Sequence, residues 1–426
     1  MKKMIFSAAA FALVAVSSIA LAPTTAEAIP AFARQTGAGC MSCHFQNFVA
    51  LNPFGRAFKM GSFTDVGDQA LIEDDDLSIP AVLNATFVIR AEYANENKTG
   101  EASTGTYEIP KDAVLMLAGR IGSNSGAFVE FDGGAANWQF LNSFDVSGFK
   151  VGIGAHKSGF GGSGVLELSN VFGQHGGKLG GKNISAIQNA GFTQDTTGIG
   201  AWIGNDLGYV QFALIAPAIA TTGITNVGLT LGKMVRAVAT LDVGGWDTLI
   251  GFGFVTGNAG KGNTAGNLAA VRVPMNMQFV DLQAQGELGH MSVGVYADWA
   301  HAKGETSAAP NVGIATGSGN FYGSIVDEAG NTVANTAGKK FDAFSIRGEI
   351  EPIERVLLGI GYGYKQLSQG APGDITVKTF HLAATYIVYQ NMELNVVFDS
   401  AKLNDPTAAL ASSTTRKVVL EVEALM

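Results

Sequence analysis

Residues 379–399 read Thr-Phe-His-Leu-Ala-Ala-Thr-Tyr-Ile-Val-Tyr-Gln-Asn-Met-Glu-Leu-Asn-Val-Val-Phe-Asp and contain two runs in which apolar and polar side chains alternate. In the first run, apolar and polar faces are formed by Phe380, Leu382, Ala384, Tyr386 and Val388 against Thr379, His381 and Thr385. In the second, they are formed by Met392, Leu394, Val396 and Phe398 against Asn391, Glu393, Asn395 and Asp399. Because side chains of a strand point alternately to its two faces, each run predicts a strand, and the short link between them predicts a hairpin.

About sixteen segments with this period follow residue 79. They are expected at 79–94, 106–121, 126–131, 136–146, 149–156, 196–203, 208–216, 228–241, 246–256, 276–287, 291–302, 341–350, 355–365, 375–388, 392–401 and 415–425. The connections between successive segments alternate in length. Every second connection is a short turn, whereas the others are generally longer loops and include 157–195 and 303–340. Short turns at one end and long loops at the other are typical of an outer-membrane barrel, whereas a soluble β-sandwich has no reason to sort its links this way.

The predicted fold is therefore all-β: a porin-like, antiparallel transmembrane β-barrel of about sixteen strands over residues 76–426. Both termini should lie at the short-turn, periplasmic end, and Phe380, Val396 and Phe398 should face lipid. A barrel of this size leaves a lumen. Only 15% of residues are charged, against a typical ~25%, so we expect something else to fill part of this lumen. One feature departs from the usual pattern, because the last residue is Met426 and not an aromatic residue.

The N-terminus has the pattern of a secretory signal peptide. Lys2 and Lys3 precede an apolar run, and Ala26-Glu27-Ala28 fits the cleavage site, so residues 1–28 are expected to be removed. An anchoring helix is disfavoured because Pro23 interrupts a short run. After residue 28, no run approaches the ~20 apolar residues of a transmembrane helix. The net charge of −9 disfavours nucleic acid as a partner.

The chain's two cysteines lie in the pentapeptide Cys40-Met41-Ser42-Cys43-His44. In an exported protein, C-x-x-C-H is the attachment signature of c-type haem, because two thiols bind one porphyrin and the adjacent histidine reaches the iron. The alternatives are a disulfide, a thioredoxin-like pair, which needs a βαβ context, and zinc, which needs four ligands. The motif predicts one c-type haem on Cys40 and Cys43, with His44 as the axial ligand.

The second axial ligand of the iron is left open by the sequence. Met60 lies within reach of the motif and is a candidate, with a packing role as the alternative. His156 and His381 lie on the polar faces of their strands, so they are expected to face the lumen as lining residues or as iron ligands. His175 is expected near the outer mouth, and 164–175 is a candidate for a short helix folded inward.

Phe32-Ala33-Arg34-Gln35-Thr36-Gly37 precedes the motif, and Leu51-Asn52-Pro53-Phe54-Gly55-Arg56-Ala57-Phe58-Lys59 follows it. With the single C-x-x-C-H, these stretches of residues 29–64 resemble the N-terminal module of the fused outer-membrane monohaem cytochrome–porin family, whose best known members are iron oxidases. The resemblance implies Fe(II):cytochrome c oxidoreductase activity, with extracellular Fe(II) as the donor and a periplasmic c-type cytochrome as the acceptor. It does not fix the residue at position 60.

Residues 29–75 are thus expected to form a monohaem cytochrome c module and a linker. So short a module cannot bury a sizeable core alone, so it should lean on the haem and plug the lumen. The acidic run at 73–76 is either a solvated linker or a cation-attracting ring at the pore mouth. The leading function is electron transfer across the outer membrane. The alternatives are exchange with another extracellular donor or acceptor, and a passive porin with an accessory cytochrome domain.

Overall fold

The computed structural model describes residues 30–46, 50–67, 69–75, 77–132, 135–158, 165–170, 179, 184–189, 196–217, 231–261, 271–274, 276–302, 325–326, 332–333, 340–368, 373–406 and 411–426. The predicted signal peptide and His175 lie outside the described residues. Among the described helices, none is both long and apolar enough to span a membrane.

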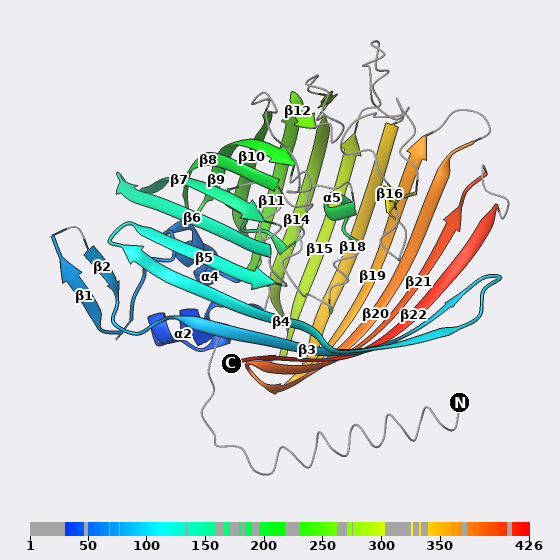
Figure 1. Ribbon diagram of the computed structural model, residues 1–426, viewed down its shortest axis with the longest axis horizontal. Coiled ribbons are helices and arrows are strands. Elements are labelled where there is room, and N and C mark those ends of the chain that lie inside the picture. Colours follow the sequence, from blue (N-terminus) through cyan, green and yellow to red (C-terminus); the bar gives the residue numbers. More distant parts are fainter. Residues whose placement is uncertain are drawn as a thin grey trace.

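Sixteen strands pair antiparallel and form one closed barrel (Figure 1). They are β3 (Ala85–Lys98), β4 (Thr104–Gly122), β5 (Ser125–Asp132), β6 (Ala135–Val146), β7 (Phe149–Ser158), β8 (Thr196–Asn205), β9 (Gly208–Pro217), β10 (Gly232–Val243), β11 (Trp246–Thr256), β14 (Met277–Leu288), β15 (Met291–Ala302), β18 (Lys340–Ile353), β19 (Val356–Ser368), β20 (Ile375–Tyr389), β21 (Met392–Asn404) and β22 (Ser412–Leu425). The barrel closes where β22 pairs with β3. The predicted number of strands and their antiparallel order are confirmed.

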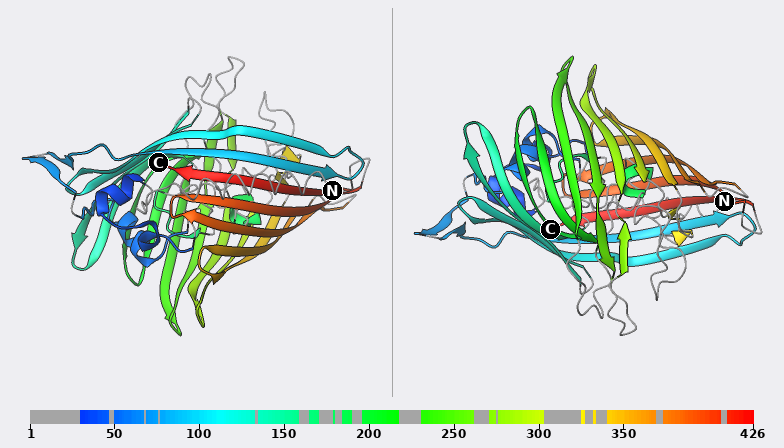
Figure 2. Two further views of the ribbon diagram at one scale, coloured as in Figure 1. Left: turned by 90° about the horizontal axis from the view of Figure 1, so that it is seen from below. Right: turned by 90° about the horizontal axis from the view of Figure 1, so that it is seen from above.

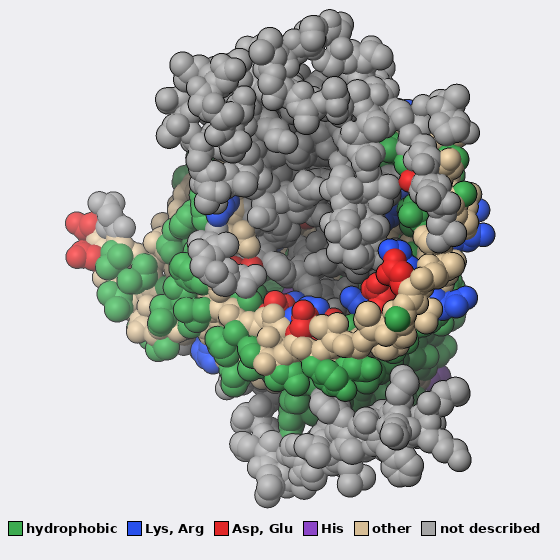
Figure 3. All heavy atoms as spheres, turned by 45° about the vertical axis from the view of Figure 1, so that its right-hand side comes forward, with side chains coloured by type: hydrophobic (Ala, Val, Ile, Leu, Met, Phe, Trp, Pro, Cys, Tyr) green, Lys and Arg blue, Asp and Glu red, His purple; other side chains and the backbone are tan. Residues whose placement is uncertain are grey.

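The outer wall of the barrel is apolar, and Figure 3 shows hydrophobic side chains covering it below the rim. Its exposed residues include Phe140, Ile153, Ile199, Phe212, Ile250, Phe252, Phe344, Ile346, Ile360 and Leu382. As predicted, Phe380 and Val396 belong to this surface, with Phe398 half-buried beside them. A closed barrel with an apolar exterior satisfies its backbone while facing hydrocarbon, which locates the chain in an outer membrane.

Val388 departs from this face. It is predicted beside Phe380 and Tyr386 but is buried, because the pairing of β20 with β21 shifts register between Ile387 and Tyr389. An extra residue in one strand reverses the side on which the following side chains point.

Both ends of the described chain lie at the end of the barrel that carries the short turns. The Ala31 backbone N–H donates to Thr86 Oγ1 at 3.0 Å, and the Phe87 N–H donates to the Met426 carbonyl at 2.8 Å. Met426 thus takes part in closing the barrel although it is not aromatic. The predicted common side of the two termini is confirmed.

The inside of the barrel holds two insertions. The helices α2 (Pro30–Thr36), α3 (Cys40–Cys43) and α4 (Pro53–Met60) lie within the ring of strands at the short-turn end (Figure 2). Residues 165–170 and α5 (Ala186–Asn189), from the long link after β7, also lie inside and are largely buried. Apolar side chains around α5 form one cluster, and apolar side chains between α4, residues 165–168 and the wall form another. The low content of charged residues led us to expect that part of the lumen is filled, and these two insertions fill it.

Two predicted segments differ from the structure. Of the helix predicted at 164–175, residues 165–170 are described; they fold inward without forming an α-helix, because their backbone bonds to side chains of the wall, and the other residues of that prediction lie outside the described residues. The acidic run, expected as a solvated linker or a ring at the pore mouth, belongs to a two-stranded hairpin of β1 (Leu71–Asp74) and β2 (Leu77–Pro80) outside the barrel. The first barrel strand accordingly begins at Ala85 rather than at 79.

Candidate functional site

The C-x-x-C-H segment is shaped by the start of the next helix. Asn52 caps α4, because its Oδ1 accepts from the Gly55 N–H at 3.0 Å. Its amide Nδ2 donates to the backbone carbonyls of Ser42 at 2.9 Å and His44 at 3.3 Å. A Cβ on Gly55 would lie 2.1 Å from the Cys43 carbonyl oxygen, so only glycine lets α4 approach this closely. Asn52 and Gly55 thus hold the end of α3 against α4.

Cys40 and Cys43 lie on one turn of α3 and are not joined in a disulfide. Cys40 is buried against the turn between β20 and β21, where its N–H bonds to Gln390 Oε1 and its thiol to the Gln390 carbonyl, each at 3.1 Å. Burial, and secondarily the Asp65 carboxylate, raise the pKa of Cys43 to about 11. An activated redox pair needs a lowered thiol pKa, so this environment is unlike that of a thioredoxin-type site.

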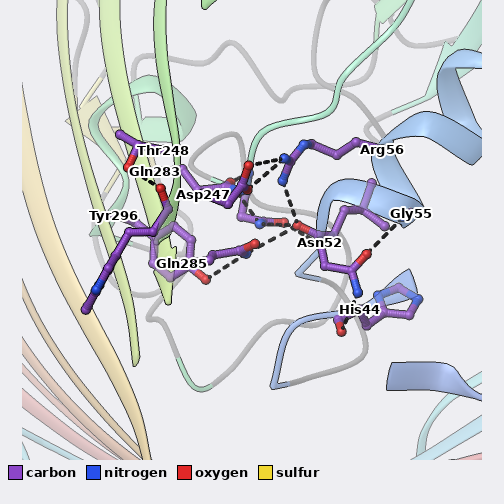
Figure 4. A network of polar contacts seen from close by, with 12 residues as sticks. His44, Asn52, Gly55, Arg56, Asp247, Thr248, Gln283, Gln285 and Tyr296 are labelled. Atoms are coloured by element: carbon purple, nitrogen blue, oxygen red, sulfur yellow. Dashed lines mark hydrogen bonds and ion pairs between the residues drawn. The ribbon is translucent and has the colours of Figure 1, made fainter. Parts of the chain in front are cut away.

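His44 follows α3 directly, and its ring points away from the polar network on the other side of Asn52 (Figure 4). Its Nδ1 atom is enclosed and has no hydrogen-bond partner in the described part of the chain. Burial lowers the pKa of His44 to about 4, so the imidazole is neutral, which is the form that binds a metal. Two thiols that are not joined in a disulfide, with a neutral imidazole beside them whose Nδ1 has no partner among the described residues, fit the requirements of a covalently attached haem.

Met60 is placed among apolar side chains of the barrel wall. It is buried in a cluster with Phe58, Phe63, Trp202 and Tyr209. Its sulfur lies 3.0 Å from where a Cβ on Gly204 would be, so glycine at that position makes room for it. These surroundings favour the packing role of Met60.

An ion pair fixes the module to the wall. Arg56 Nη2 of α4 lies 2.8 and 2.7 Å from the two carboxylate oxygens of Asp247, at the start of β11 (Figure 4). The carbonyl of Leu51, which pairs with His44, accepts from Gln285 Nε2 of β14 at 3.2 Å. His44 is thus connected through Leu51 to Gln285 of β14, and through Leu51 and Arg56 to Asp247 of β11.

Further contacts complete this attachment on other sides of the module. Gln46 Nε2 donates to the Ser292 carbonyl at 2.7 Å, and Ser62 Oγ donates to Ser143 Oγ at 2.9 Å. A Cβ on Gly126 of β5 would lie 2.0 Å from the Ser62 carbonyl oxygen, so the module lies directly against the strand there. The module is therefore held from several sides of the barrel.

A buried charge network, which sequence reasoning missed, anchors the second insertion. Arg236 on β10 is fully buried and contacts both oxygens of Glu167, at 2.9 Å each, and both of Asp281, at 2.8 and 2.9 Å. Tyr209 Oη lies 2.7 Å from Arg236 Nη1. The only signal in the sequence is a charged residue at an inward position of a strand, which does not reveal its partners.

The lumen histidines are buried at inward positions, as predicted. His381 bonds through Nδ1 to Asp399 Oδ1 at 2.7 Å and through Nε2 to the Leu179 carbonyl at 3.1 Å. Its Nε2 therefore holds Leu179, a residue of the long connection after β7, against the wall, and its Nδ1 bonds to the neighbouring strand β21. His156 is buried on β7 beside Gly198. In the described ranges, no group of three or more His, Cys, Asp or Glu side chains is arranged to hold a metal ion.

Comparisons with known proteins give likenesses of the barrel only. No protein-family model matches the chain, and no curated protein does. Among solved structures, OmpT of Vibrio cholerae superposes with a TM-score of 0.48 at 11% identity, covering 84% of this chain and 100% of that one. An anion-selective porin from Comamonas acidovorans gives 0.46 at 11%, covering 81% and 99%. The channel DcaP of Acinetobacter baumannii gives 0.45 at 12%, covering 81% and 97%.

At these TM-scores and identities, the similarity says nothing about which solutes the chain passes or whether it carries out redox chemistry. The assignment of the fold rests on the strand pairing described above. The resemblance of residues 29–64 to the cytochrome–porin family remains a prediction.

Proposed function

We propose that this outer-membrane barrel transfers electrons through a single c-type haem carried by its N-terminal module. The observation that carries the proposal is the position of the C-x-x-C-H helix and the adjoining α4, which lie inside the barrel and are bonded to its wall through Cys40 and Arg56, respectively. A redox centre held there is enclosed by the barrel, at the end that faces the periplasm.

Three residues would hold the haem. Cys40 and Cys43 supply the two thioether sulfurs, and His44 binds the iron through its imidazole. Asn52 keeps these groups in place through its contacts with the carbonyls of the motif. When bound, the haem supplies a one-electron couple. Met60 packs against the wall, so we assign it no ligand role.

Ferrous iron is the donor that the resemblance favours. One Fe(II) ion loses one electron and becomes Fe(III) at the outer side, and one electron reduces a periplasmic c-type cytochrome from the ferric to the ferrous state. The activity is then that of an Fe(II):cytochrome c oxidoreductase.

The test uses whole cells that carry the chain in their outer membrane. Fe(II) added anaerobically to oxidised cells should produce the absorption bands of reduced c-type haem, and the Cys40→Ala/Cys43→Ala variant should show no such change. If the intact chain carries haem that Fe(II) does not reduce, iron is not the donor and another extracellular donor or acceptor takes its place. If it carries no covalent haem, the electron-transfer proposal falls.

A passive porin with an accessory module is the second candidate, because a sixteen-stranded closed barrel is an architecture that passes solutes. It predicts that planar-bilayer conductance is high in the intact chain and unaffected by the two cysteine substitutions. Electron transfer predicts low conductance, because α2–α4 and residues 165–170 occupy the lumen.

A further inference from the structure

The hairpin formed by β1 and β2 is an unexpected feature of the fold. It makes its own two-stranded sheet and does not join the barrel. In the views of Figures 1 and 2 it projects beyond the short-turn end, and β2 lies against the end of β4. An isolated two-stranded hairpin is marginally stable in water, so its persistence outside the barrel requires contacts.

One face of the hairpin has such contacts. Cross-strand partners share a face, so Glu73 and Ser78 lie together. Ser78 Oγ accepts from Arg120 Nη2 at 2.6 Å and Nε at 3.1 Å. Arg120 also donates to the Thr64 carbonyl at 3.1 Å and, through its backbone, to Gln35 Oε1 at 2.8 Å. Arg120 therefore joins the hairpin to the cytochrome module.

The opposite face makes no polar contact of this kind with the described residues of the module or the barrel. It consists of Ile72, Asp74, Leu77 and Ile79, because Ile72 pairs with Ile79 and Asp74 with Leu77. Ile72 and Leu77 are 50% and 41% exposed. Asp74 and the adjacent Asp75 are exposed, and neither makes an ion pair with any described basic side chain. We call this surface, with Asp75, the hairpin face.

We propose that the hairpin face docks a basic, haem-carrying periplasmic protein that receives the electron. Apolar side chains bordered by charges of one sign are the composition of a transient protein interface, in which the charges steer a partner of opposite sign. Anionic lipid headgroups would be repelled by the same carboxylates, and so would the hairpin of a second copy. The link through Arg120 places the docked protein beside the module.

The role of this partner as electron acceptor rests on the proposed function, whereas its binding does not require it. The probe is a basic mitochondrial-type cytochrome c, titrated into the purified full-length chain in detergent. Two probe forms are used, the native iron form and a redox-inactive zinc-substituted form. Binding of the zinc form tests the hairpin face alone, and loss of electron transfer with retained binding counts against the proposed function only.

The decisive variant is Asp74→Asn/Asp75→Asn. The matched control is Asp206→Asn/Glu354→Gln, which removes the same charge from two exposed residues of other short turns. We expect about a tenfold weaker affinity at low ionic strength and a flatter salt dependence for the hairpin variant, and little change for the control. An Ile72→Ser/Leu77→Ser variant should weaken binding at all salt concentrations. Equal affinities of hairpin and control variants would overturn the proposal, as would a hairpin-dependent dimer detected by light scattering.

Discussion

Removal of the Asp247 carboxylate should loosen the N-terminal module from the barrel. Arg56 Nη2 lies within 2.8 Å of both oxygens of Asp247, and the two side chains are 6% and 19% exposed. Breaking a buried ion pair by removing one partner costs about 3–5 kcal/mol. Because Asp247 retains some contact with water, the lower end applies to Asp247→Asn, about 3 kcal/mol. At 1.4 kcal/mol per factor of ten, the equilibrium for opening the module shifts roughly a hundredfold.

Amide hydrogen exchange of the detergent-solubilised chain measures this opening. In Asp247→Asn, the amides of α4 should exchange roughly a hundredfold faster, with those of β20 unchanged. Adding Arg56→Met should recover part of the protection, because no charge is then left buried without a partner. Asp206→Asn, in another short turn, serves as the control. Unchanged α4 exchange in Asp247→Asn would refute the reasoning that this ion pair holds the module in place.

Three other substitutions test the site and its attachment. Cys40→Ala/Cys43→Ala should lose covalent haem, and haem staining of that variant on a denaturing gel would contradict the attachment. Met60→Ala should leave the haem absorption spectrum unchanged and destabilise the module by about 2–5 kcal/mol, as for a buried methionine; loss of a sulfur-to-iron band would instead make Met60 a ligand. Gly126→Ala should displace the module, because the new Cβ meets the Ser62 carbonyl, and limited proteolysis should then cleave residues 50–67 faster while the barrel stays resistant.

The barrel was predictable because its information is local. Alternation along a strand and the lengths of the links are read directly from neighbouring residues, and for β11 and β15 the predicted and observed bounds coincide. The hairpin at 71–80 was not predicted, because its strands are short and the acidic run reads as a solvated linker.

The contacts of the site were not predictable for a related reason. Asp247 follows Arg56 by 191 positions, and Asp281 follows Arg236 by 45. Alternation places Asp247, Arg236 and Asp281 on the inward faces of their strands, but it does not say which inward residues meet one another or which of them meet Arg56 of α4. The C-x-x-C-H motif predicts which residues would bind a haem, whereas the contact of Cys40 with Gln390 depends on closure of the barrel.

The enclosure of the module has a consequence for biogenesis. The module precedes every barrel strand, yet its contacts come from β11, β14, β15 and the turn after β20, and the ring is complete only when β22 pairs with β3. Once the ring is complete, Cys40 is 2% exposed and bonded to Gln390. On the proposed haem attachment, an enzyme that attaches the haem could no longer reach that thiol. The cofactor would then have to be installed while the module is still outside, so maturation would precede insertion and the barrel would be assembled around the finished module.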